Sequence, residues 1–341
     1  MKVVYKTIGA LACLIFVSCY FLGCNGARDD IDENKEVQLN SGSIIGTEDG
    51  EVVNYNLVNN GYTKLENNTV IAAYEYNSGN YFGQNNKEYI VGYNGKEKII
   101  KDVKNTDKYF NISPDGEKMF FFREEGDNEI KILSFKDEEY FEFNKEVSIS
   151  GKYIDWMDKD TIVYYGIRLE DKKNAIFQYN IKTKEESVLI SLDEGNVEFI
   201  KSVDNGLVYV HNDISGNKDL VLYDYKTGEI SAIIQNILKV YDVVKVNDYY
   251  YLLGRFKETN YSLFKVYNGE YKRMVYKFPD KISLEKGLMK TDDGSVLFIG
   301  IDSEEKEQVY QCKENGAVSL LFDRVDNVTF IKKAIAQSAD Y

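Results

Sequence analysis

Residues Phe110 to Glu124 read FNISPDGEKMFFFRE, in which two apolar runs flank the turn Ser113–Gly116. Proline presets the backbone for a turn, and Asp and Gly accept the geometry of tight turns. The flanking runs have the length and composition of short strands. The stretch therefore predicts a β-hairpin, and it raises the question of whether this hairpin is one copy of a repeat.

Similar apolar–turn–apolar units do recur along the chain. Their turns centre near residues 79, 116, 159, 206, 248 and 294, which gives spacings of 37 to 47 residues. A second strand–turn–strand motif follows each hairpin. Its seven copies cover residues 52–65, 89–100, 130–143, 176–190, 220–234, 263–276 and 309–322.

A repeat of this length with four short strands and no convincing helix is typical of a β-propeller blade. We therefore predict an all-β chain folded as a single propeller of seven four-stranded blades. One misread boundary would make the number six or eight. The first unit, 43–65, has only three strands, so we expect the segment Val328–Ala336 (VTFIKKAIA) to supply its missing inner strand. Pairing of the N- and C-terminal segments would close the ring and cover its open edges.

The unit at 110–124 resembles the repeat of TolB-like (WD-repeat-like) propellers, in which Ser-Pro-Asp-Gly joins two apolar strands. Residues 153–165, with Trp156 just before the turn, resemble the same unit. The Trp-Asp dipeptide of true WD repeats and the double glycines of kelch repeats are missing. The resemblance implies the fold and a role as an interaction platform in the cell envelope.

The first 24 residues have the pattern of a secretory leader. Lys2 and Lys6 precede an apolar run, Ile8–Leu22, that is short for a membrane span. Phe21–Cys24 (FLGC) resembles the lipobox of bacterial lipoproteins, which implies cleavage before Cys24 and diacylglycerol on its sulfur. Phe16–Cys19 (FVSC) is a second possible box. Ordinary secretion and an uncleaved anchor also stay open.

These features divide the chain into a signal peptide at 1–23, an acidic flexible tether at 24–41 and the propeller at 42–341. The net charge of −14 disfavours nucleic-acid binding, because an acidic chain repels phosphate backbones. With two cysteines removed in the leader and Cys24 acylated, Cys312 stands alone. We expect it to be an apolar strand residue rather than a reactive thiol.

No catalytic constellation is recognisable in the sequence. His211 is the only histidine and ends a predicted strand, so we expect a structural role rather than a catalytic base. The acidic loops 213–219 and 124–129 have oxygens for calcium but lack EF-hand spacing, and we expect solvated turns. With 56 acidic residues, the sequence gives no basis for choosing a catalytic pair of carboxylates.

The tyrosines offer one sharper possibility. Tyr164–Tyr165 and Tyr249–Tyr251 would stack on sugars if they lined the rim, but neighbouring strand residues alternate faces. We expect them to pack between blades.

Together these observations predict a binding or scaffold protein, not an enzyme, held by lipid on the outer face of the cell membrane. Its partner would be an envelope protein or a glycan, with no cofactor and no metal. The alternative is a glycan-processing hydrolase or lyase that uses carboxylates in the channel, and a third possibility is a structural assembly subunit.

Overall fold

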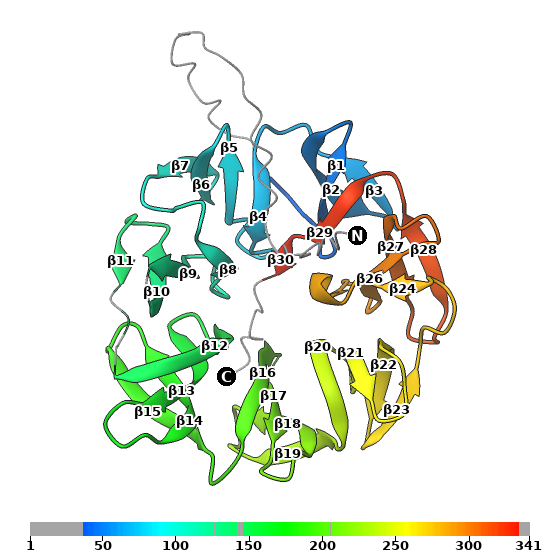
Figure 1. The fold of residues 1–341 in the computed structure, drawn as a ribbon. Helices are drawn as coiled ribbons and strands as arrows, with labels where there is room; N and C mark the ends of the chain where they lie inside the picture. The colour runs from blue at the N-terminus through cyan, green and yellow to red at the C-terminus, as the bar shows by residue number, and fades with distance from the viewer. Residues whose placement is uncertain (1–36, 126, 142, 144–145, 205, 334–341) are drawn as a thin grey trace, which may run out of the picture.

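The computed structural model describes residues 37–333 except 126, 142, 144–145 and 205. Seven sheets stand in a ring around a central axis (Figure 1). The predicted seven-bladed propeller is therefore confirmed. The predicted signal peptide and Cys24 lie outside the described residues.

Blades one to four follow the chain in order around the ring. From the innermost strand outward they are β29 (Asp326–Phe330), β1 (Ile44–Glu48), β2 (Glu51–Val58) and β3 (Gly61–Lys64); β4 (Val70–Tyr74), β5 (Tyr81–Asn85), β6 (Glu88–Tyr93) and β7 (Lys96–Ile100); β8 (Lys108–Ile112), β9 (Lys118–Glu125), β10 (Asp127–Ser134) and β11 (Tyr140–Phe141); and β12 (Val147–Trp156), β13 (Thr161–Arg168), β14 (Asn174–Asn180) and β15 (Glu185–Ser191).

Blades five to seven complete the ring, and the last has a divided inner strand, β24 and β25. They are β16 (Asn196–Val203), β17 (Gly206–Asn212), β18 (Lys218–Asp224) and β19 (Ile230–Ile234); β20 (Ile237–Val246), β21 (Tyr249–Phe256), β22 (Ser262–Tyr267) and β23 (Glu270–Arg273); and β24 (Lys281–Ile282), β25 (Leu288–Lys290), β26 (Val296–Ile301), β27 (Glu307–Cys312) and β28 (Val318–Phe322).

The Ser-Pro-Asp-Gly turn joins β8 to β9, as predicted, and it also ties neighbouring blades together. Gly116 has φ 72°, and a Cβ there would lie 2.2 Å from Ser78 Oγ in the turn of blade two. Only glycine meets both demands. On the other side, Lys118 Nζ donates to the carbonyl oxygen of Lys159, at 3.0 Å, in the turn of blade four. The hairpin therefore links three consecutive blades.

The C-terminal segment closes the ring. β29 pairs antiparallel with β1, with Ile44 opposite Phe330, so the predicted closure is confirmed. The strand begins two residues before the predicted Val328 and ends at Phe330. The next residues add a short strand to blade two as well: β30 (Lys332–Lys333) pairs parallel with β4. Between the two strands, Ile331 is fully buried and donates its N–H to the carbonyl oxygen of Ser43 at 2.9 Å. One short segment thus fastens two blades.

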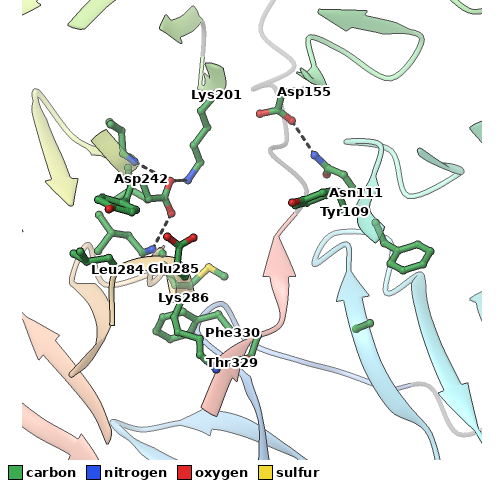
Figure 2. A pocket seen from close by; sticks show the side chains of 18 of the residues that line it. Tyr109, Asn111, Asp155, Lys201, Asp242, Leu284, Glu285, Lys286, Thr329 and Phe330 are labelled. Carbon is green, nitrogen blue, oxygen red and sulfur yellow. Dashed lines mark hydrogen bonds and ion pairs between the residues drawn. The ribbon is translucent and has the colours of Figure 1, made fainter. Parts of the chain in front are cut away.

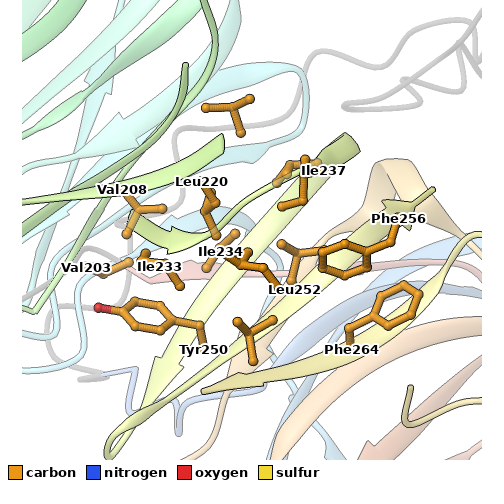
Figure 3. Close-up of a cluster of buried hydrophobic side chains, with 14 residues drawn as sticks. Val203, Val208, Leu220, Ile233, Ile234, Ile237, Tyr250, Leu252, Phe256 and Phe264 are labelled. Atoms are coloured by element: carbon orange, nitrogen blue, oxygen red, sulfur yellow. The ribbon is translucent and has the colours of Figure 1, made fainter. Parts of the chain in front are cut away.

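The hydrophobic core is divided among the interfaces between blades. Seven clusters of buried side chains each combine residues of two neighbouring blades. Figure 3 shows the cluster between blades five and six, where Val208 and Leu220 face Leu252 and Phe264. Burial of apolar area contributes roughly 25 cal/mol per Å², so neighbouring blades hold each other through these clusters.

The two faces of the ring differ in what they carry. In each other blade a turn joins the end of the innermost strand to the start of the second strand. In blade one the end of β29, at Phe330, lies opposite the start of β1, at Ile44, so both described ends of the chain lie on the same face as these turns. We call it the terminal face. Before β1, Val37 accepts a hydrogen bond from Tyr74 Oη at 2.8 Å and Leu39 is buried, so Val37 and Leu39 lie against blade two. The opposite, distal face carries the connections between blades.

Candidate ligand-binding channel

The central channel forms a cavity among the described residues. Its volume is about 1290 Å³, and the inner strands of all seven blades line it. A ligand pocket of a few hundred Å³ already holds a small molecule, so this cavity has room for a larger ligand or an inserted loop. Both aromatic and polar residues contribute to its wall. Tyr109, Tyr153 and Tyr241 are half-buried there, whereas Phe120, Trp156 and Phe330 belong to the wall but are buried.

Blade seven sends an insertion into the channel. Five residues, Ser283–Gly287, stand opposite the single residue Ile299, and they include the short 3₁₀ turn η1 (Leu284–Lys286). Gly287 has φ 74°, and a Cβ there would lie 2.6 Å from Asp242 Oδ2. Leu284, Glu285 and Lys286 consequently line the channel wall (Figure 2).

Asp242 holds this insertion in place. Its Oδ1 accepts hydrogen bonds from Lys201 Nζ at 2.5 Å and from the N–H of Val243 at 2.8 Å. Its Oδ2 accepts the N–H of Leu288 at 2.8 Å, directly after the insertion. One carboxylate in blade six therefore connects the inner strands of blades five and seven.

Asp155 repeats this arrangement across the channel. Its Oδ1 accepts hydrogen bonds from Asn111 Nδ2 at 3.0 Å and from the N–H of Trp156 at 2.8 Å, and its Oδ2 accepts the N–H of Ser202 at 2.9 Å. Blade four is thereby connected to blades three and five. Figure 2 shows the Asp155–Asn111 and Asp242–Lys201 pairs on opposite sides of the cavity.

The electrostatic setting of Asp155 is that of a carboxyl removed from water. Burial raises its pKa, while the N–H groups of Ser202 and Trp156 and the ammonium of Lys201 oppose that shift. A raised pKa in a cavity is a feature of functional sites, but it also arises in structural networks. Here the backbone partners from two blades indicate a structural network.

A third link lies at the closure of the ring. Lys286 Nζ lies 3.3 Å from Glu307 Oε2 and donates to Thr329 Oγ1 at 3.2 Å. The insertion of blade seven is therefore attached to the strand that completes blade one. No sequence pattern predicted this insertion or the two aspartate links. An aspartate flanked by apolar residues in a predicted inner strand, as in YIDW and VYDVV, is the one signal that points to them.

The residues singled out in the sequence lie elsewhere. His211 is the penultimate residue of β17, its Nε2 lies 3.0 Å from the carbonyl oxygen of Glu194, and it does not line the channel. Asp213 is used within its own loop, where it accepts the N–H groups of Ser215 and Asn217, each at 2.8 Å. The loop 124–129 lies largely outside the described side chains. Among those described, no group of three or more His, Cys, Asp or Glu is placed to hold a metal ion.

The tyrosine runs pack between blades, as expected. Tyr164 belongs to the cluster between blades three and four, and Tyr165 to the cluster between blades four and five. Tyr250 and Tyr251 divide in the same way between the two interfaces of blade six. These four rings are therefore unavailable for stacking on a sugar at the rim.

Cys312 is a buried, free cysteine in β27, as predicted for an apolar strand residue. Burial raises the pKa of its thiol to about 11. In the part of the chain that is described, no helix has the length and apolar character needed to cross a membrane.

No protein-family model and no curated protein matches this sequence. Solved propellers match its fold. The β-propeller domain of the Trilobed protease from Pyrococcus furiosus is 17% identical with a TM-score of 0.55, covering 84% of this chain and 96% of that one. Oligogalacturonate lyase from Vibrio parahaemolyticus is 13% identical with a TM-score of 0.53, covering 84% and 85%.

TolB from Acinetobacter baumannii is also among the structural matches. It is 11% identical with a TM-score of 0.49, and the match covers 85% of this chain and 66% of TolB. At these identities the comparisons show the propeller fold alone. One propeller fold serves many unrelated functions, so the fold assigns no activity to this chain.

Proposed function

We propose that this protein is a lipid-anchored binding module on the outer face of the cell membrane, which offers its propeller to an envelope protein or glycan. The channel carries this proposal. It is wide, it is lined by aromatic and hydrogen-bonding side chains, and its inner strands are fixed to one another by partly buried polar links. A fixed wall lowers the cost of binding, because little has to be ordered when a ligand enters.

Two of the channel carboxylates, Asp155 and Asp242, support binding over glycan hydrolysis or elimination; Glu198, Asp204 and Glu285 line the channel as well. A glycosidase needs two carboxyl groups that face the scissile bond and are free to exchange protons or attack. Asp155 and Asp242 instead each accept two backbone N–H groups and one side-chain donor. Their lone pairs are committed to holding neighbouring blades together.

The anchor is tested by replacing the cysteine of each candidate lipobox. We expect Cys24→Ala to release the protein into the medium of its native host, whereas Cys19→Ala stays with the membrane fraction. The apolar leader, the FLGC sequence and the position of Val37 on one face of the ring support this expectation. Membrane retention of Cys24→Ala would reject lipidation at that residue.

Binding in the channel is tested through the only tryptophan of the chain. Trp156 belongs to the channel wall and is 3% exposed, so its fluorescence reports on a ligand that contacts or shifts this wall. We would titrate the full chain with cell-wall oligosaccharides and with short peptides, and use Trp156→Phe to identify unspecific changes. A saturable spectral shift from one class supports the proposal. Unchanged fluorescence and unchanged thermal stability with every probe would contradict it.

A further inference from the structure

Blade six differs in charge from the rest of the molecule. The whole chain has 42 basic and 56 acidic residues, but residues 237–281 contain nine basic and five acidic ones. This blade is therefore a locally cationic region of a strongly acidic protein. Such a local reversal of sign favours a partner with the opposite charge.

Large apolar side chains of blade six and its connection to blade seven are exposed on the distal face. Leu238 is 42% exposed, Tyr261 43%, Tyr276 65% and Phe278 55%. Leu238 begins the inner strand, Tyr261 lies in the loop between β21 and β22, and the other two follow β23. We call these four residues, with Arg255 and Arg273, the blade-six patch. Exposed large apolar residues gathered at one end of a blade are typical of an interaction site.

The aromatic rings of the patch are held in position by arginines. Arg255 Cζ lies 5.6 Å from the centre of the Tyr261 ring, and its Nε donates to the carbonyl oxygen of Thr259 at 2.9 Å. Arg273 Cζ lies 5.3 Å from the centre of the Tyr276 ring, and its Nε donates to the carbonyl oxygen of Val275 at 2.6 Å. The surface is thus ordered before any partner arrives.

The positive charges of the patch are not neutralised by the described part of the chain. Arg255 stands directly opposite Lys239 in the pairing of β20 with β21. Like charges at such positions are unfavourable. Within the described residues, none of Lys239, Arg255 and Arg273 has an acidic side chain at ion-pair distance. An acidic group from outside would relieve this repulsion.

We propose that the blade-six patch is the docking site of a protein partner with an acidic surface, an inference that rests on the proposed binding function. Tyrosine, arginine and exposed apolar side chains together are the composition of energetic centres in protein interfaces. Leu238 and Phe278 offer nothing to the hydroxyl groups of a glycan. The patch also lies on the face opposite Val37, where the tether departs, so it faces away from the anchored end.

Its position connects the patch to the channel. Tyr241 lines the channel and contacts Tyr261 edge to face, with ring centres 5.7 Å apart. A partner seated on the patch therefore reaches the channel mouth beside Glu285 and Leu284. We expect the acidic partner surface to lie over blade six and a projecting segment to enter the cavity.

The test is photo-crosslinking of the full, lipidated chain in its native host. A benzophenone amino acid replaces Tyr276 or Tyr261 in the patch, Leu284 in the channel, or Tyr267 as a matched control. Tyr267 is 47% exposed in the same blade, but it lies at the turn between β22 and β23 on the terminal side. We expect an adduct with one acidic protein from positions 276 and 261 and none from position 267.

Charge reversal at exposed lysines, away from the supporting hydrogen bonds, makes the test specific. Lys257→Glu combined with Lys277→Glu should lower the yield of the adduct about tenfold, whereas Lys272→Glu on β23 should not. An equal yield from the double variant would overturn the proposal. Adducts from position 284 alone would also overturn it, although they would still support binding in the channel. A protease-resistant glycan adduct would overturn it as well, because the partner would then not be a protein. Absence of adducts at all four positions would reject both proposals.

Discussion

On each of two sides of the channel, one aspartate connects three neighbouring blades, but the side chain that donates to it differs. Asp155 and Asp242 both use Oδ1 for the next N–H of their own strand and for a side chain of the preceding blade, and Oδ2 for an N–H of the following blade. The side chain is the neutral amide of Asn111 in one case and the ammonium of Lys201 in the other. Because only one of the two donors is charged, the two sites share the arrangement of hydrogen bonds around the aspartate and not an ion pair.

The comparison is tested most strongly by removing the more buried carboxylate. Asp155→Ala leaves two backbone N–H groups and the amide of Asn111 without their acceptor, so we expect a loss of about 3 kcal/mol in the free energy of unfolding. Urea denaturation of the full chain measures it. A loss below about 1 kcal/mol would show that water replaces the carboxylate.

Asp242→Ala should cost less, about 2 kcal/mol, because Lys201 keeps access to solvent. The side chain of Lys201 is 24% exposed. The variant should also loosen the insertion at Ser283–Gly287, which hydrogen exchange at the N–H of Leu288 would detect. If this variant is less stable than Asp155→Ala, the ion pair matters more than the shared geometry.

Lys201→Met should have a smaller effect, about 1 kcal/mol, because both backbone donors to Asp242 remain. Lys218→Met is the matched control in the same blade, since Lys218 pairs with Glu198 at 2.7 Å and is 23% exposed. It should cost less, because its pair carries no link to a further blade. Equal losses in the free energy of unfolding from both variants would show that the Lys201–Asp242 pair stabilises the protein no more than a pair within one blade.

The pH dependence of stability should distinguish Asp155 from an exposed carboxylate. The pKa of Asp155 is raised in the folded protein. The stability that Asp155 adds to the free energy of unfolding, relative to Asp155→Asn, is therefore fully present below the unfolded pKa of about 3.9. It is lost as the pH rises through the folded pKa. Asp213 has a lowered pKa, owing to hydrogen bonds from Asn217. Its contribution relative to Asp213→Asn should instead be lost as pH falls. Urea unfolding between pH 3 and 8 measures how the stability difference of each variant changes with pH. If the two differences changed in the same direction, the opposite pKa shifts of Asp155 and Asp213 would be contradicted.

Most of the ring could be predicted from sequence because its elements are local. Each hairpin carries its own turn residues, as at Pro114–Gly116. Each single hairpin pattern is weak, but its recurrence at a regular spacing indicates a propeller. The unpaired first unit likewise predicted the pairing of the segment near Val328. The parallel pairing of Lys332–Lys333 with β4 could not be predicted, because two residues leave no periodic pattern. The insertion Ser283–Gly287 was hidden for a similar reason, since it lies within a strand whose two halves read as separate short segments.

The channel could not be predicted in the same way, because its links join residues about 40 positions apart in different repeats. Nothing in the sequence indicates that Asp242 lies beside Lys201 and Leu288 until the blades are placed around the axis. The blade-six patch is intermediate. Its charge can be counted in the sequence, but the exposure of Tyr276 and Phe278 depends on how the chain passes from blade six to blade seven.

The closure of the ring also has a consequence in time. Ile44 pairs with Phe330, so the first strand to emerge during synthesis waits for one of the last described segments. Until Asp326–Phe330 arrives, blade one presents an open strand edge, and blade seven lacks a neighbour. Contacts this distant in sequence form slowly, because the intervening chain must be brought together first. A chain that folds while it is being synthesised would therefore pass through an open arc of blades before it becomes a ring.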